Sequence, residues 1–331
     1  MKLWKEPSES ENLYLPNYKL SNGNKKIYCI DPKLNIKISH KFLTFWHQGP
    51  TNKKNLTNIA KCVAYITKTF AKFCYFNTNN LPIMYKSHHQ DIVTHIDQGI
   101  EILFRIWIKK HFPQDLVIGE ECQNKLLKPT KGTWYIDPID GTSNFINQQP
   151  NFALQLCYVK NNEPLMSYLY LPKKKKSFLA VKGNKIKPLK IENKLCIGTE
   201  FLDHKIKQKQ TFIKLSNLLN ANSYRIKAIG PHLLNLFQAN SSAFYKEDIK
   251  IWDLLPPLAF LKLKQHPFWK ISLYTNKNYI NKIEPFDTSQ ETLNYYNNCQ
   301  KNNFRIGTII ITPNNLPDLE KKIISMLKKQ C

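Results

Sequence analysis

Three strand-like segments in the middle of the chain limit its fold more than any other feature of the sequence. Between residues 152 and 181 the segments FALQLCYV, LMSYLYL and SFLAV are separated by turn-forming residues at 160–162 and 173–176. Apolar segments of this length joined by short turns predict an antiparallel meander. A sheet of this kind needs other elements to cover its apolar faces.

Two amphipathic helices are predicted before the meander, because apolar residues recur there at spacings of three and four. The first covers about 58–76 and the second begins near residue 96. Their apolar faces consist of Ile59, Val63, Ile66, Phe70 and Phe73 in the first helix and Ile96, Ile100, Leu103 and Trp107 in the second. Further strand-like runs at 116–118, 134–136, 195–197 and 306–311 alternate with helix-like segments at 230–239 and 316–327. This order predicts a layered α+β architecture.

The chain of 331 residues is long enough for one large domain or two intimate halves. Residues 1–55 are polar and contain several prolines, so we expect an N-terminal extension, whose role the sequence does not reveal. Residues 56–331 are expected to form the main domain, with halves at about 56–190 and 191–331.

The formal net charge of +25 raises the question of nucleic-acid binding. The basic residues are almost all lysines and are spread along the chain, which favours a solvated surface over a nucleic-acid site. The 8 cysteines form no CxxC pair, which is typical of reduced thiols. No signal-peptide pattern and no apolar run of about 18–20 residues occurs, so we expect a cytoplasmic protein without membrane contact.

Acidic residues are scarce in this chain, yet several of them follow strand-like or begin helix-like segments. Glu120 follows LVIG, Asp137 and Asp140 lie in WYIDPIDGTSNF, Asp253 lies in IWDLLPP, and Asp97 lies near the start of the second helix. Carboxylates that meet in one cleft repel each other unless a cation lies between them. A site with only oxygen ligands suits Mg²⁺ or Mn²⁺ rather than zinc.

The residues Gly141-Thr142-Ser143-Asn144 come directly after the acidic pair. Glycine allows close approach of the backbone, and Thr, Ser and Asn often begin helices, whose free amides bind anions. Metal ions beside an anion site are the equipment of phosphoryl transfer. DPIDG alone is more typical of a simple turn. Its order with Gly119-Glu120-Glu121 upstream and Trp252-Asp253 downstream favours the metal site.

Taken in order, these motifs resemble the inositol monophosphatase superfamily over roughly residues 58–331. They are Lys86…Asp91-Ile-Val-Thr94-His-Ile-Asp97, Ile118-Gly-Glu120-Glu121, the segment from Trp134 to Phe145, and Trp252-Asp253. The resemblance implies a layered αβαβα sandwich. It also implies hydrolysis of a phosphate monoester with two or three Mg²⁺ ions, with Mn²⁺ as an alternative.

The resemblance also assigns roles to individual residues. The implied metal ligands are Glu120, Asp137, the carbonyl of Ile139, Asp140 and Asp253. Thr142 and Asp97, together with Glu120, would orient and deprotonate the attacking water. The amides of Gly141 and Thr142 would hold the phosphate. Lys86 would lie near the cleft, and Asp91 would cap and brace the second helix.

Substrate choice is expected to depend on departures from the family pattern. Seven residues before Asp253, inositol-specific members carry a glutamate, whereas this chain has Lys246, followed by Glu247. A lysine cannot accept hydrogen bonds from sugar hydroxyls, so it favours a second anionic group. His232 stands where a small residue usually lines the substrate side. Ser143-Asn144, in contrast, resembles the inositol phosphatase type rather than the bisphosphate nucleotidase branch.

The segment after Asp253 also departs from the family, because Leu254-Leu-Pro256-Pro257 replaces small residues. Proline is tolerated in the first helical turn, so we expect a helix that starts at Asp253, with Leu255 and Pro256 changing the pocket wall.

The sequence thus predicts a Mg²⁺-dependent phosphatase of the inositol monophosphatase type that acts on a small phosphorylated metabolite. A 3′(2′),5′-bisphosphate nucleotidase and a sugar bisphosphatase remain alternatives within the superfamily. A basic, non-catalytic protein that binds phosphate or RNA is the alternative of another class. The sequence leaves a homodimer open.

Overall fold

The structure is a computed structural model. It describes residues 18–22, 25–29, 37–38, 40–72, 83–85, 92–127, 132–184, 196–199, 206–218, 222–238, 243–265, 269–275, 282–302, 305–313 and 317–328. Within them, no helix is both long enough and apolar enough to cross a membrane.

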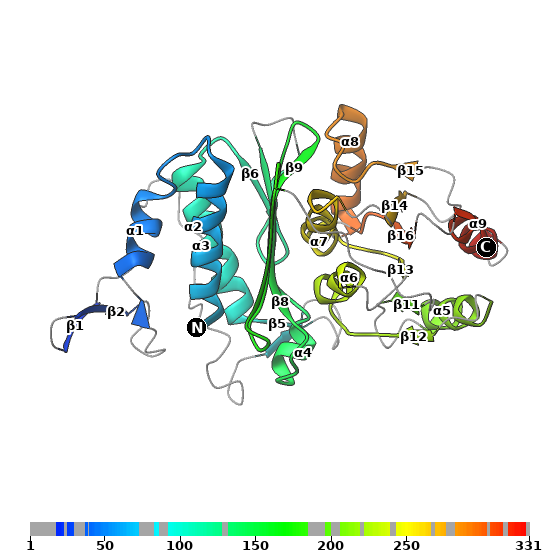
Figure 1. The fold of residues 1–331 in the computed structure, drawn as a ribbon, viewed down its shortest axis with the longest axis horizontal. Coiled ribbons are helices and arrows are strands. Elements are labelled where there is room, and N and C mark those ends of the chain that lie inside the picture. Colours follow the sequence, from blue (N-terminus) through cyan, green and yellow to red (C-terminus); the bar gives the residue numbers. More distant parts are fainter. Residues whose placement is uncertain are drawn as a thin grey trace.

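Helices and sheets alternate in five layers (Figure 1). The first helical layer contains α1 (His40–Gln48), α2 (Leu56–Phe70) and α3 (His95–His111). The middle layer, between the two sheets, contains α6 (Ile229–Phe237) and α7 (Ile251–Leu263), with α8 (Gln290–Cys299) beside α7. The outer layer contains α5 (Ile206–Leu218) and α9 (Pro317–Lys328). This is the αβαβα sandwich that the sequence predicts.

The first sheet has five strands in the order β10-β9-β8-β7-β6. They are β6 (Leu116–Gly119), β7 (Thr133–Asp140), β8 (Ala153–Lys160), β9 (Glu163–Leu171) and β10 (Lys176–Val181). The strands β7 to β10 pair antiparallel in sequence order, which confirms the meander, whereas β6 runs parallel to β7. Asn161 and Asn162 form the β8–β9 turn with φ of 52° and 63°, a backbone conformation that asparagine tolerates.

The second sheet has six strands in the order β12-β11-β13-β16-β14-β15. They are β11 (Cys196–Thr199), β12 (Asn222–Tyr224), β13 (Ala243–Lys246), β14 (Trp269–Tyr274), β15 (Lys282–Ile283) and β16 (Thr308–Pro313). The remaining strands are β1 (Tyr18–Asn22), β2 (Lys25–Cys29) and β3 (Lys37–Ile38), which pair with each other, and β4 (Ile83–Tyr85) and β5 (Ile92–Thr94), which form a pair. A short helix, α4 (Thr142–Ile146), follows β7.

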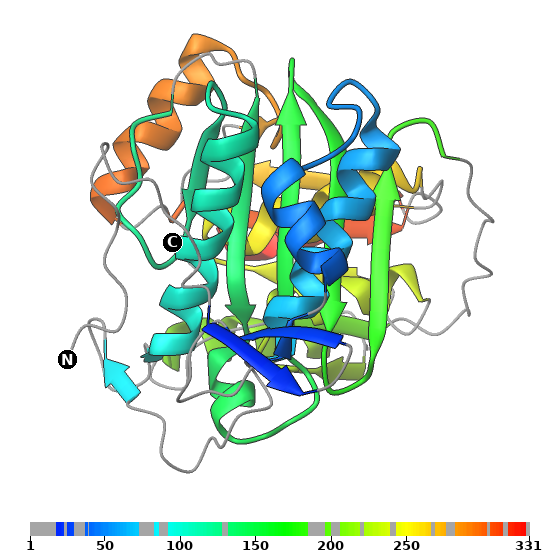
Figure 2. The ribbon, with the colours of Figure 1, turned by 90° about the vertical axis from the view of Figure 1, so that its left-hand side faces the viewer.

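The helices α2 and α3 lie against the first sheet (Figure 2), and the described residues of their predicted apolar stripes pack into the core there. Residues Ile59, Val63, Ile66 and Phe70 of α2 and Ile100, Leu103 and Trp107 of α3 are each at most 2% exposed. The helix α2 begins at Leu56, where the Asn55 side chain accepts hydrogen bonds from the amides of Thr57 and Asn58. That cap places its start two residues before the expected one. The expected end near residue 76 lies outside the described residues, as does Phe73.

The helix α7 begins at Ile251 rather than at the expected Asp253, so its two prolines lie in the second turn. Pro256 and Pro257 have no N–H groups to donate to the preceding turn. The hydroxyl of Ser167 donates to the Pro256 carbonyl over 2.7 Å, which ties this turn to β9. Leu255 is 1% exposed and lies in the core between the sheets, so its bulk contributes to packing between the layers.

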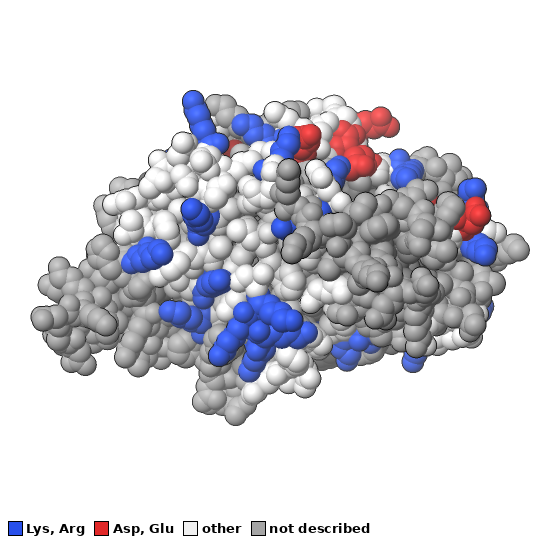
Figure 3. All heavy atoms as spheres, viewed as in Figure 1, with Lys and Arg blue, Asp and Glu red and all other residues white. Residues whose placement is uncertain are grey.

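Lysines are spread over the molecular face drawn in Figure 3, and acidic residues gather along its upper edge. The four lysines at 173–176 are exposed at the β9–β10 turn. Partial burial of its ammonium group, together with the charge of Lys176, lowers the pKa of Lys174.

Candidate metal and phosphate site

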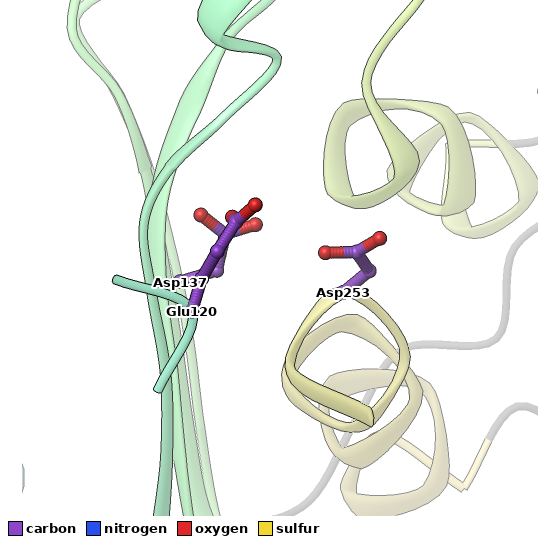
Figure 4. Close-up of side chains that lie close together, drawn as sticks. All are labelled: Glu120, Asp137 and Asp253. Atoms are coloured by element: carbon purple, nitrogen blue, oxygen red, sulfur yellow. The ribbon is translucent and has the colours of Figure 1, made fainter. Parts of the chain in front are cut away.

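Three carboxylates from separate segments meet between the first sheet and α7 (Figure 4). Glu120 follows β6, Asp137 lies within β7, and Asp253 lies in the first turn of α7. One oxygen from each lies within 4.8 Å of the other two. Because β6 and β7 are parallel neighbours, their carboxyl ends bring Glu120 and Asp137 to the same edge of the sheet. The helix α7 then brings Asp253 to face them.

Asp137 is the least solvated member of this cluster, with 1% of its surface exposed. Burial raises its pKa well above the ordinary value, and the charges of Glu120, Asp140 and Asp253 raise it further. Its Oδ2 accepts a hydrogen bond from Gln155 Nε2 over 3.2 Å, whereas Oδ1 has no partner among the described residues. A buried oxygen without a donor beside two further carboxylates fits a hard divalent cation.

One basic side chain compensates part of this negative charge. Lys250 Nζ lies 3.8 Å from Glu120 Oε1 and 5.5 Å from the centroid of the Trp252 ring. Its side chain is 14% exposed. Lys250 was not predicted from the sequence, because it belongs to none of the motifs. The only sequence feature that pointed to Lys250 was its position three residues before Asp253.

Asp140, next to the three-carboxylate cluster, accepts hydrogen bonds from the start of α6. Its Oδ1 accepts the amide of Ile229 over 2.9 Å, and its Oδ2 accepts the amide of Gly230. An irregular pairing between Asp137 and Asp140 interrupts the β7–β8 register. A negative charge is favourable at this position, because the first amides of a helix have no intrahelical acceptor.

Gln155 is a second residue that the sequence analysis missed. It lies opposite Asp137 in β8 and is 1% exposed. A Cβ at Gly230 would overlap Gln155 Oε1, so the glycine lets α6 pass close to this side chain. The Gln155 amide orients Asp137 through its hydrogen bond to Oδ2.

Thr142, Asp97 and Ile139 lie together, as the resemblance implies. Thr142 Oγ1 is 3.2 Å from Asp97 Oδ1 and 3.1 Å from the Ile139 carbonyl oxygen. Asp97 is 1% exposed and lies in the first turn of α3. A hydroxyl has a single hydrogen, so Thr142 donates to one of these two acceptors at a time.

The backbone turns sharply at Gly141, which precedes α4 with φ of 88°. A Cβ there would lie 2.7 Å from the Ala228 side chain. Asn144 Nδ2 also donates to the carbonyl of Ile226 over 2.8 Å. The start of α4 is thus held against the segment that leads into α6.

The residues expected to choose the substrate are engaged within the chain. Lys246 Nζ donates to the Glu247 carbonyl over 2.7 Å, and the Tyr245 hydroxyl donates to the Glu247 carboxylate. His232 is fully buried, with its ring edge-on to Phe244 at 5.1 Å. Lys86 and Asp91 lie outside the described residues.

Comparisons with known proteins agree with this fold. The profile of the inositol monophosphatase family matches residues 52–262, more than half of the chain. Inositol-1-monophosphatase of Bacillus subtilis is 36% identical over 121 residues, which span 36% of this chain and 45% of that protein. Inositol monophosphatase 1 of Rattus norvegicus is 30% identical over 194 residues, 53% of this chain and 70% of that protein.

A solved structure of an IMPase/NADP phosphatase complexed with Mg²⁺ and phosphate superposes with a TM-score of 0.62 at 20% identity. The match covers 82% of this chain and 95% of the other. The relatives are inositol monophosphatases, which places the chain in the class of phosphatases, enzymes that hydrolyse phosphate monoesters. The chain belongs to the inositol monophosphatase family.

Proposed function

We propose that this protein hydrolyses a small phosphate monoester and depends on Mg²⁺, with Mn²⁺ as a substitute. The observation that carries the proposal is the meeting of Glu120, Asp137 and Asp253 around a buried Asp137 oxygen that has no donor among the described residues. The Mg²⁺ and phosphate of the solved neighbour support this choice of cofactor and ligand.

In this proposal Glu120, Asp137 and Asp253 hold the cations, with Asp140 and the Ile139 carbonyl as further ligands. Bound Mg²⁺ supplies an electrophile for the phosphate oxygens and lowers the pKa of water. The amides of Gly141 and Thr142 face the phosphate.

Thr142 and Asp97 orient the attacking water. When the Thr142 hydroxyl donates its hydrogen to Asp97 Oδ1, the lone pairs of the Thr142 oxygen are left to accept a hydrogen bond from water. Asp97 thereby fixes the direction in which that water presents its own lone pair. Glu120 shares the removal of the proton from the water.

The substrate is an inositol phosphate or a bisphosphorylated nucleotide or sugar. The bisphosphorylated class is favoured by Lys246, which places a cation where a hydroxyl-binding glutamate is usual in the inositol-specific members. The relatives from Bacillus subtilis and Rattus norvegicus support catalysis over a role in binding RNA or phosphate alone, because both are named as phosphatases.

The experiment is a phosphate-release assay on the purified protein with inositol 1-phosphate, fructose 1,6-bisphosphate and 3′-phosphoadenosine 5′-phosphate. We expect turnover in Mg²⁺ or Mn²⁺ and none in excess chelator. Asp253→Asn should lose turnover, whereas Asp248→Asn is the matched control because that side chain is exposed. Activity should also be lost when Glu120, Asp137 or Asp140 becomes alanine.

Undiminished activity in chelator would refute metal dependence. Salt-sensitive RNA binding without any turnover would favour the binding protein.

A further inference from the structure

The loop after β6, which carries Glu120, is held by a buried side chain of α3. Glu101 is fully buried. Its Oε2 accepts the amide of Glu121 over 2.7 Å, and its Oε1 accepts the amide of Cys122 over 3.2 Å. A Cβ at Gly119 would overlap this carboxylate, so the glycine allows the loop to approach α3. Glu101 thus holds the backbone directly after Glu120.

Arg105, one turn further along α3, neutralises Glu101 and extends the contact to the loop. Its Nε donates to Glu101 Oε1 over 2.7 Å, and a second guanidinium nitrogen donates to Asn124 Oδ1 over 2.7 Å. A third nitrogen lies 3.3 Å from the Val117 carbonyl of β6. A buried carboxylate is stable in the fold only when it is paired and hydrogen-bonded, and this arrangement provides both.

The Asn124 side chain closes the loop that contains Glu120 by binding back to Gly119. Its Oδ1 accepts the amide of Gly119 over 2.8 Å, and its Nδ2 donates to the Gly119 carbonyl over 2.6 Å. The amide and the carbonyl of Gly119, the residue before Glu120, are therefore both bound by the Asn124 side chain.

The same loop is held from the other side by α8 and the short 3₁₀ helix after it. Asn297 accepts the amide of Leu127 over 2.6 Å and donates to the Leu127 carbonyl over 2.7 Å. Gln300 Nε2 donates to the Asn124 carbonyl over 3.0 Å. These contacts join residues about 170 positions apart in the chain.

The contacts of Glu101, Arg105, Asn124 and Asn297 with the loop after β6 form a clamp on that loop. The position of Glu120 explains why this clamp matters. Asp137 lies in a strand and Asp253 in a helix, whereas Glu120 lies in the loop. Repulsion from the other two carboxylates favours movement of an unrestrained Glu120 away from the site. Ordering a mobile ligand at the moment of binding also weakens affinity, and a ligand that is ordered beforehand avoids that loss.

We infer that Glu101, Arg105, Asn124 and Asn297 are positioning residues that hold Glu120 within reach of the cation. The inference rests on the proposed function, because it assumes that the carboxylate cluster binds Mg²⁺. It goes further by assigning part of the cation affinity to side chains of α3, of α8 and of the loop itself. These side chains do not bind the cation.

The experiment is calorimetric titration of Mg²⁺ into the full chain, together with the Mg²⁺ dependence of turnover. The variants are Asn124→Ala and Asn297→Ala, and Asn298→Ala is the matched control because it is exposed on the same helix. Residues that hold metal ligands typically contribute about 10–100-fold to affinity. We expect a loss of that size in Asn124→Ala, a smaller loss in Asn297→Ala and no change in the control. Turnover at saturating Mg²⁺ should remain close to wild type.

Circular dichroism establishes that each variant is folded at the titration temperature. Unchanged Mg²⁺ affinity in folded Asn124→Ala and Asn297→Ala, even with a lower melting temperature, would show that the contacts serve stability alone and would overturn the inference. If Asn124→Ala does not fold, Asn297→Ala decides by the same criterion. A wild-type protein that binds no Mg²⁺ would instead refute the proposed function, and the inference with it.

Discussion

Replacing Asp137 by asparagine should stabilise the cation-free protein, although it removes a side chain from the site. The ligand oxygens of this cluster lie within 4.8 Å of one another, and two unit charges at that outer limit repel by about 3.5 kcal/mol at an effective dielectric constant of about 20. The wild-type protein relieves part of this repulsion by holding a proton on Asp137, whose pKa is raised by burial and by its acidic neighbours. We therefore expect a net gain of about 1–3 kcal/mol at neutral pH in chelator.

The sign of the pH dependence follows from the direction of the pKa shift. The folded protein binds the Asp137 proton more tightly than the unfolded chain does, because the folded pKa is the higher one. The stability of the cation-free wild type should therefore fall as the pH rises from about 4 through the raised pKa. Asp137→Asn removes this contribution, so its advantage over the wild type should grow with pH across the same window.

Urea denaturation at pH 5 and pH 8 measures both effects, first in chelator and then in Mg²⁺. A cation present at about 100 times its dissociation constant adds about 2.7 kcal/mol to the wild type, and Asp137→Asn should gain less. The exposed Asp248→Asn should follow the wild type in every condition. The reasoning would be refuted by an Asp137→Asn protein that is less stable than the wild type in chelator at pH 8, or that gains equally from Mg²⁺.

Two further substitutions test the water-orienting pair and the substrate position. Thr142→Ala should keep its Mg²⁺ affinity in calorimetry but lose about 10²–10⁴-fold in turnover, because the hydroxyl next to Asp97 assists proton removal. A rise in the Michaelis constant alone would reduce Thr142 to a phosphate contact. Lys246→Ala should weaken kcat/KM for bisphosphorylated substrates by about 10- to 150-fold, whereas Glu247→Ala should change it little. If Glu247→Ala abolishes turnover of inositol 1-phosphate and Lys246→Ala has no effect, the preference for a second anion is wrong.

The sequence predicted the parts of the fold that depend on local pattern. The meander of β8, β9 and β10 and the apolar stripes of α2 and α3 follow from spacing along the chain, which fixes which side chains share a face. The start of α7 was placed two residues too late, because family likeness located Asp253 but did not show that two residues before it are already helical. The start of α2 was also placed two residues too late, because apolar spacing does not reveal the Asn55 cap.

The candidate site divides in the same way. The residue types and their order located Glu120, Asp137 and Asp253, and the structure brings these three together. The partner of Asp140 was not predictable, because its carboxylate meets amides 89 and 90 positions away. Gln155 and Lys250 were missed for a related reason. Gln155 matters because it contacts Asp137, and Lys250 matters because it lies near Glu120. Neither residue belongs to a sequence motif.

The location of the cluster explains how the fold tolerates its mutual repulsion. Asp137 belongs to the first sheet and Glu120 to the loop directly after its strand β6, whereas Asp253 belongs to the helix layer behind them. Repulsion among the three therefore pushes two layers apart. Contacts around the cluster oppose that separation, with Asp140 binding the first amides of α6 and Asn144 binding the segment before it. Asn297 of α8 binds the loop after β6 from the same layer. Because these bonds surround the carboxylates, a cation entering between them meets ligands that are already in place, and its binding relieves repulsion without a large rearrangement of the layers.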